Sequence, residues 1–445
     1  MSDQVRWLYD QLGRWTAQGL ISGDQAARIR DLYPAPRAAL PWGLILFSGI
    51  GAIVAGLGVI LLGAYNWHVI PKFGKLAIIF GILAAAHATG LWLRTRTDWR
   101  WHLGEVVCLL GSMFFGAGIW LIAQIYHIEE HFPNGFLIWG LGVLAMGWAL
   151  SSVTHGLLAT VLLAVWGCLE AWEYNTPVHW APLLLLVGSL GLAYRTRSAW
   201  LWFAGTGALL LTVFANAGEV RTDLVLPVLI NVSALLVALS LVVRGRPQFS
   251  GSEWGWAFFG WLGFVLSVYF LGFASVVDEG LGWQPWQQGG PSSEVVTCYR
   301  GIPLALTVLG WVAVACVCRL TPSRDGRPSD CSWEDWLLPL TALITQLLAL
   351  RALEVPAGAA AAVYNLVFLA VAVMWMARGC RAGSLRPMLL GSLMLIALTA
   401  ARYFDLFESL AVRGFLFLLI GGVLFAEGFF YRHARRQVVP AEEKR

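Results

Sequence analysis

Long apolar runs recur along almost the whole chain and leave it few folds to adopt. A helix needs about 20 apolar residues to cross a hydrocarbon core about 30 Å thick, and only helices and closed barrels can satisfy their backbone groups inside lipid. About fourteen runs approach that length. They lie at roughly 42–66, 74–93, 104–126, 134–151, 154–171, 179–194, 199–217, 224–243, 255–275, 301–319, 334–351, 357–377, 385–401 and 411–431. We therefore expect an all-α fold, a polytopic transmembrane bundle of about 14 helices.

The composition agrees with a chain whose partner is the lipid bilayer. Hydrophobic residues make up 58% of the sequence and charged residues 13%, whereas soluble domains carry about 45–50% and about 25%. The net charge is only +4, and no basic face exists outside short loops, so we expect no nucleic-acid partner. The seven cysteines form no metal motif, and we assign neither a disulfide nor a cofactor.

The distribution of Lys and Arg predicts the orientation. With the N-terminus inside and fourteen spans, 23 of the 30 basic residues fall in inside segments and 7 in outside segments. Cytoplasmic loops are enriched in Lys and Arg. We expect both termini in the cytoplasm, and the 432–445 segment forms a basic cytoplasmic tail.

The first 40 residues predict a small cytoplasmic helical hairpin rather than a signal peptide, because they lack a continuous apolar core. Apolar residues follow helical spacing over 3–33, and Gly19 is placed to end the first helix. Ser22 and Gln25 fit a capping box for the second helix. We expect domains at 1–40 and 41–431, followed by the tail.

Two organisational questions stay open. The runs at 134–151 and 154–171 are short and closely joined, so they form either two spans or one re-entrant hairpin. The tetrapeptide Leu121–Gln124 resembles Leu343–Gln346, which suggests parallel repeated halves at 42–194 and 255–431.

Ionisable and amide groups inside spans are costly and often functional. Glu105 lies near the inner end of its run, close to Arg100 and His102, and His87 lies deeper in the preceding run. We take these groups and the amides expected to be buried as a candidate polar pathway. Its members are His87, Glu105, Gln124, Gln346, Asn231 and Asn365. The alternatives are local pairing at the interface and interhelical hydrogen bonds.

A second cluster is expected at the outer interface. Its members are His127, Glu130, His131, Arg402 and Asp405. Residues 127–131 also match H-x-x-E-H, a metallopeptidase pattern that requires a helix. Pro133 follows directly, which disfavours a helix there, so we assign no metal and no catalytic residue.

Three stretches together resemble a known family. The first is Gly56–Trp67 with Ile70, Pro71 and Lys75; the second is Glu105 with Gly116–Tyr126; the third is Arg402–Asp405 ahead of Gly414 and Phe415. With the hairpin in front, they resemble the bacterial multi-pass membrane proteins of domain of unknown function 2157, best over about 1–150. The resemblance implies a bacterial inner-membrane location. It implies no activity and no site residues.

Three functions remain as hypotheses. The first is transporter-like or channel-like handling of a small molecule or lipid, with the polar groups lining a path. The second is a structural or assembly partner of another membrane protein, which the scarcity of buried charge favours. The third is an intramembrane metal-dependent enzyme, supported only by scattered histidines and the H-x-x-E-H match. The substrate and oligomeric state are not encoded in any recognisable motif.

Overall fold

The structure is a computed structural model that describes most of the chain. The described residues are 2–32, 70–96, 100–128, 131–244, 246, 249, 251–281, 293–320, 333–350, 355–405 and 422. The chain divides into two compact units, Met1–Ile79 and Phe80–Arg445.

In the first unit, helices α1 (Ser2–Ala17) and α2 (Gly23–Leu32) contact each other as the expected hairpin. Gly19 between them has φ +70°, a left-handed conformation that glycine adopts without strain. The predicted capping box is present. The Ser22 backbone N–H donates to Gln25 Oε1 at 2.9 Å, and the Gln25 N–H donates to Ser22 Oγ at 3.2 Å.

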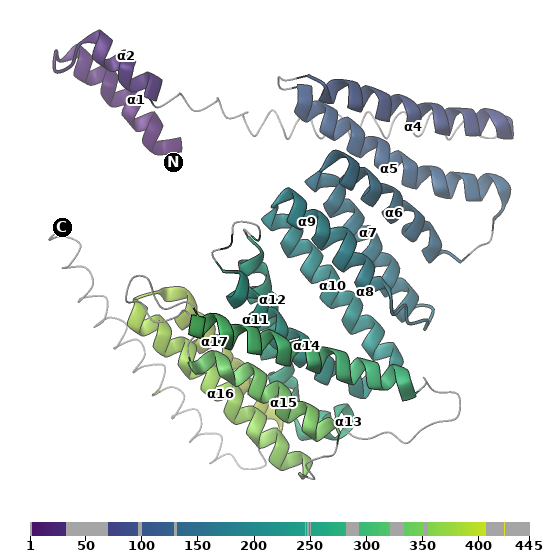
Figure 1. Cartoon of the computed structure of the whole chain (residues 1–445), viewed down its shortest axis with the longest axis vertical. Coiled ribbons are helices and arrows are strands. Elements are labelled where there is room, and N and C mark those ends of the chain that lie inside the picture. Colours follow the sequence, from purple (N-terminus) through teal and green to yellow (C-terminus); the bar gives the residue numbers. More distant parts are fainter. Residues whose placement is uncertain are drawn as a thin grey trace. The chain divides into compact units, whose positions relative to one another are not determined.

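Nine helices of the described chain are long and apolar enough to cross a membrane (Figure 1). They are α4 (Lys72–Arg94), α5 (Arg100–Tyr126), α6 (Pro133–Leu150), α7 (Val153–Trp172), α10 (Ala199–Val220), α11 (Val225–Val243) with the preceding turn η2 (Thr222–Leu224), α12 (Ser252–Leu271), α14 (Ser293–Leu320) and α16 (Ala357–Ala382). The expected helical membrane bundle is confirmed.

Three further apolar helices are shorter. The first runs without a break through α8 (Ala181–Leu184), the π-helical turn η1 (Leu185–Leu190) and α9 (Gly191–Thr196); the others are α15 (Leu337–Ala349), which follows the turn η4 (Trp333–Trp336), and α17 (Leu385–Asp405). Each expected run between 74 and 401 coincides with one of these twelve helices. The expected run at 42–66, the run at 411–431 apart from Gly422, and the 432–445 tail lie outside the described residues. A short helix, α13 (Ala274–Gly280), follows α12.

Helices α6 and α7 pack closely against each other and are joined only by Ser151 and Ser152. Their 18 and 20 residues correspond to about 27 and 30 Å at 1.5 Å per residue. That length favours two spans over a re-entrant hairpin. Ser151 has φ +49°, and both it and Ser152 donate their backbone N–H to Gly147. The reversal is therefore tight.

The spans pack around apolar cores within the second unit. One core joins α11, α12, α14, α15, α16 and α17, and it includes Phe264, Trp311 and Tyr364. Another joins α6, α7, η1 and α10 around Leu163 and Leu185. In Figure 1, α16 and α17 lie side by side, connected at Gly383, which has φ +61°.

Several tryptophans lie between helices and fix them to each other. Trp139 of α6 donates its indole N–H to the Ser112 carbonyl of α5 at 2.8 Å, and Trp311 of α14 donates to the Ala234 carbonyl of α11 at 3.0 Å. Such bonds replace water for both groups in the membrane. Gly116 of α5 leaves room for Trp139, because a Cβ atom there would clash with the indole ring.

Candidate functional site

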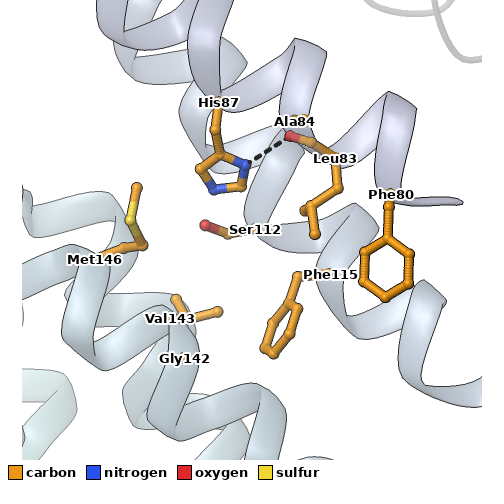
Figure 2. Close-up of a pocket in the computed structure, with 9 residues that line it drawn as sticks. All are labelled: Phe80, Leu83, Ala84, His87, Ser112, Phe115, Gly142, Val143 and Met146. Atoms are coloured by element: carbon orange, nitrogen blue, oxygen red, sulfur yellow. Dashed lines mark hydrogen bonds between the residues drawn. The ribbon is translucent and has the colours of Figure 1, made fainter.

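A pocket of about 480 Å³ lies among α4, α5 and α6 (Figure 2). Most of its wall is apolar. The residues that line it are Phe80, Leu83, Ala84, His87, Ser112, Phe115, Gly142, Val143 and Met146. Volumes of about 300–1,000 Å³ are typical of small-molecule sites, which combine apolar walls with a few placed polar groups. The pocket is therefore large enough to hold part of an apolar molecule.

Two polar side chains face this pocket, His87 and Ser112 (Figure 2). His87 Nδ1 lies 3.1 Å from the Leu83 carbonyl, and a carbonyl can only accept, so Nδ1 carries the hydrogen. In the neutral ring Nε2 is then an acceptor. Ser112 is 2% exposed, and its Oγ has no hydrogen-bond partner within the described part of the chain. The pocket thus offers an acceptor and a hydroxyl, and its nine lining residues include no carboxylate, lysine or arginine.

Close helix packing positions His87. Gly111 of α5 faces its ring, and a Cβ atom on Gly111 would lie 2.6 Å from both His87 Cε1 and Nδ1. Gly90 of α4 is similarly tight against Cys108 of α5. Small residues let membrane helices approach this closely, so α4 and α5 hold the imidazole in place.

A second polar group is centred on Glu105, near the start of α5. Arg94, from the last turn of α4, forms an ion pair with the Glu105 carboxylate, and each side chain is 14% exposed. Ser152 and Thr154 both donate hydroxyl hydrogen bonds to Glu105 Oε1, the latter at 2.7 Å. The carboxylate therefore has one cationic partner and two hydroxyl donors, which together offset the cost of removing it from water.

Arg94 is held by more than the carboxylate. It donates to the Leu150 carbonyl at 3.1 Å, at the end of α6, and its guanidinium lies 4.9 Å from the centre of the Trp101 ring. We expected Glu105 to pair near its own helix end, close to Arg100 and His102. The partner that the structure shows comes from the preceding helix, because Gly90 and Gly104 let α4 and α5 approach closely enough to bring Arg94 alongside.

His155 completes this Glu105 cluster, which we define as Arg94, Glu105, Ser152, Thr154 and His155. Its ring is fully buried, and Nδ1 lies 2.7 Å from Ser152 Oγ. Ser152 also caps α7, because its Oγ accepts the His155 backbone N–H at 3.2 Å.

The Glu105 cluster is not arranged as a hydrolytic triad. In a triad the serine hydroxyl donates to a histidine that a carboxylate orients from its other nitrogen. Here Ser152 donates its hydroxyl hydrogen to the carboxylate of Glu105 and not to the histidine. Ser152 therefore lies between His155 Nδ1 and Glu105 in one series of hydrogen bonds. The cluster is suited to holding the helices together, and the Ser152 hydroxyl, the only serine hydroxyl in it, is buried.

The remaining members of the expected polar pathway do not join these two sites. Asn231 is buried and donates to the Pro227 carbonyl at 2.7 Å, while Asn365 donates to the Gly272 carbonyl at 3.0 Å. Gln346 is buried and lies 3.5 Å from the Arg300 carbonyl. Gln124 is exposed in the described part of the chain. The expectation that Gln124 is buried is wrong there, because it lies in the last turn of α5.

No contact between two members of the expected outer interfacial cluster is found among the described residues, so this cluster stays a prediction. His127 follows the end of α5 with φ +53°, so α5 ends before the H-x-x-E-H segment begins. His131 Nε2 instead lies 2.8 Å from Glu170 of α7, which also accepts from Trp166 at 3.1 Å. Glu130 lies outside the described residues, and the side chains of Arg402 and Asp405 are likewise not described. No group of three metal-ligating side chains occurs among the residues described.

Several important polar residues escaped the sequence analysis. Ser112, Ser152 and His155 read as ordinary helix and loop residues. Ser152, three residues before His155, is typical of a helix N-cap. The sequence does not show that its hydroxyl donates to Glu105 of another helix. Asp223 was missed as well. It is buried, and both Arg221 and Arg300 donate to its carboxylate at 2.8 and 2.9 Å.

The comparison with protein families bears on both sites. Residues 13–156 match the family described as "Predicted membrane protein (DUF2157)". The resemblance expected over about 1–150 is confirmed there. All nine pocket residues and the whole Glu105 cluster fall inside the matched segment, whereas the weaker resemblance near 400–431 falls outside it. No curated protein and no solved structure matches the chain.

Proposed function

We propose that this protein is a transporter-like membrane protein that binds a neutral, largely apolar molecule in the pocket among α4, α5 and α6. The observation that carries the proposal is the pocket itself, with its apolar wall and two polar groups. Phe80 at its edge is 55% exposed, so the pocket borders the surface that these spans present to lipid.

The lining restricts the chemistry of the molecule. An ionised head group would lose its water in this pocket without meeting an opposite charge from the lining residues, which is costly. A hydroxyl group fits better, because it can donate to His87 Nε2 and exchange a hydrogen bond with the Ser112 Oγ. A lipid with a free hydroxyl, such as a diacylglycerol, has this combination of groups.

Photolabelling tests the proposal with a matched pair of variants. The full chain in nanodiscs is irradiated with a photoreactive diacylglycerol, and the labelled peptides are mapped by mass spectrometry. Ala84 and Ala85 are both exposed residues of α4, but only Ala84 lines the pocket. Ala84→Trp should fill the pocket and reduce labelling of α4, α5 and α6 by about tenfold, the effect of losing ~1.4 kcal/mol of binding.

Ala85→Trp adds the same side chain next to the pocket and should leave labelling unchanged. A photoreactive phosphatidylglycerol should label both variants equally, because an anionic head group is excluded. Equal diacylglycerol labelling in Ala84→Trp and Ala85→Trp would contradict a binding site in the pocket. It would favour the second candidate, a structural or assembly partner, which the solid packing around Phe264 and Tyr364 supports.

We also infer a bacterial inner-membrane location with both termini in the cytoplasm. The 23 to 7 distribution of basic residues supports this orientation, and it places the Glu105 cluster on the cytoplasmic side. A periplasmic reporter fused after Arg246 should be inactive, while one inserted within 276–300 should be active. The reverse pattern would require the inverted orientation.

A further inference from the structure

The Nε2 atom of His155 is a buried polar group that the proposed function does not use. The side chain is fully buried, and Nε2 has no hydrogen-bond partner among the described residues. A buried acceptor without a partner is costly, and such atoms often have a role in proton transfer or binding. The ionisable side chains around the ring are His87 and Arg94 from α4 and Glu105 from α5, and the backbone of Cys108 lies beside the ring.

The hydrogen bonds of the Glu105 cluster have a defined direction. Glu105 is paired with Arg94 and accepts the Ser152 hydroxyl hydrogen. Because that hydrogen is used, Ser152 Oγ must accept from His155 Nδ1, which therefore carries a hydrogen. The neutral ring then has its lone pair on Nε2. The result is a single chain that runs from His155 through Ser152 to the carboxylate.

We infer that His155, Ser152 and Glu105 form a proton relay between the interior of the α4–α5–α7 contact and this end of the helices. A proton binds to the Nε2 lone pair. Nδ1 then gives its proton to Ser152 Oγ while Ser152 gives its hydroxyl proton to Glu105 Oε1, from which it leaves to solvent. One proton enters and one leaves, and no bond between heavier atoms changes. Rotation of the serine hydroxyl and exchange of the histidine tautomer restore the starting arrangement.

The relay points toward the pocket along α5. Glu105, Cys108 and Ser112 are spaced by three and four residues, so they lie on one face of this helix. His87 contacts the same helix at Gly111 and lines the pocket with Ser112. Proton movement can therefore be coupled to occupancy of the pocket. The relay rests on the proposed function only in this coupling.

Time-resolved infrared spectroscopy tests the relay in the full chain in nanodiscs. The sample is mixed rapidly from about pH 5 to about pH 8, a range that spans ordinary histidine titration, so the proton leaves His155 in the direction that the hydrogen bonds allow. The His155 signal is the difference between the wild type and His155→Gln. Ser152→Asn keeps a capping side chain for α7 but removes the hydroxyl. It should slow deprotonation of His155 by at least about tenfold, since positioned proton transfer contributes ~10²–10⁴.

Two further variants separate relay from structure. Ser152→Thr retains both the cap and the hydroxyl, so His155 should lose its proton at the wild-type rate. Thr154→Val removes a hydroxyl that also donates to Glu105 but does not bridge to His155, and it too should leave the rate unchanged. The relay is overturned if His155 gives no titration signal, if Ser152→Asn matches the wild type, or if Thr154→Val slows the rate as much as Ser152→Asn.

The outcome is independent of the labelling experiment. A normal relay in Ala84→Trp together with lost diacylglycerol labelling would support both proposals. A relay that works while diacylglycerol labels Ala84→Trp and Ala85→Trp equally would support the relay and overturn only the pocket. A failed relay, together with diacylglycerol labelling that Ala84→Trp reduces and Ala85→Trp does not, would support the pocket and overturn the relay.

Discussion

The ion pair between Arg94 and Glu105 provides the sharpest energetic test of the structure. Glu105→Gln removes the negative charge while keeping an oxygen that accepts from Ser152 and Thr154. Arg94 would remain mostly buried, with only the Leu150 carbonyl and the Trp101 ring as partners. Removing one member of a buried pair costs about 3–5 kcal/mol, and the retained contacts favour a loss of about 3 kcal/mol.

Arg94→Met should cost a similar amount, because it leaves the carboxylate with hydroxyl donors alone. The double variant buries no unpaired charge, so we expect it to lose about 2 kcal/mol and not the ~6 kcal/mol sum. Unfolding of the four proteins in mixed detergent micelles, followed by tryptophan fluorescence, gives the double-mutant cycle. Glu173→Gln, at an exposed carboxylate after α7, is the matched control and should change stability by less than about 0.5 kcal/mol. A coupling energy below about 0.5 kcal/mol would refute the buried pair.

Two further predictions concern packing and charge elsewhere in the bundle. Gly116→Ala should destabilise the protein by about 1–3 kcal/mol, because the added methyl group clashes with Trp139. The matched control is Gly81→Ala, whose added methyl group meets no atom within 4 Å. It should leave the stability in the same micelle assay unchanged. Asp223→Asn should lower the free energy of unfolding by about 3 kcal/mol, since it leaves the Arg300 guanidinium without its buried counter-charge. Wild-type stability of Asp223→Asn would show that the arginine is neutralised by another group.

The helices could be predicted from the sequence because, inside lipid, each span must form all of its backbone hydrogen bonds within itself and is therefore a long apolar helix. Run length alone therefore predicted each of the twelve apolar helices from α4 to α17, although α14 begins well before its expected run and the short helix α13 was not predicted. The capping box at Ser22 was readable for a related reason, since both of its partners lie within one turn. The runs are apolar on all sides, however, so periodicity does not show which face of a span meets which neighbour.

That limitation explains why the candidate sites were found only in part. His87 and Glu105 were recognisable as rare ionisable residues inside spans. Their surroundings were not, because Ser112, Ser152 and His155 acquire importance only from helices that meet in space. Gln124 shows the opposite error. Its residue type suggested a buried amide, but its position in the last turn of α5 leaves it exposed in the described part of the chain.

The two-residue connection between α6 and α7 has a mechanical consequence. Ser151 and Ser152 are both bonded to Gly147 in the last turn of α6, so the connection has little slack. Val143 and Met146, which form one wall of the pocket, lie on the same helix one to two turns earlier. A tilt of α6 that moves these two residues would therefore also displace Ser152, the residue that joins His155 to Glu105. The α6–α7 hairpin thus links the pocket wall directly to the serine hydroxyl of the relay.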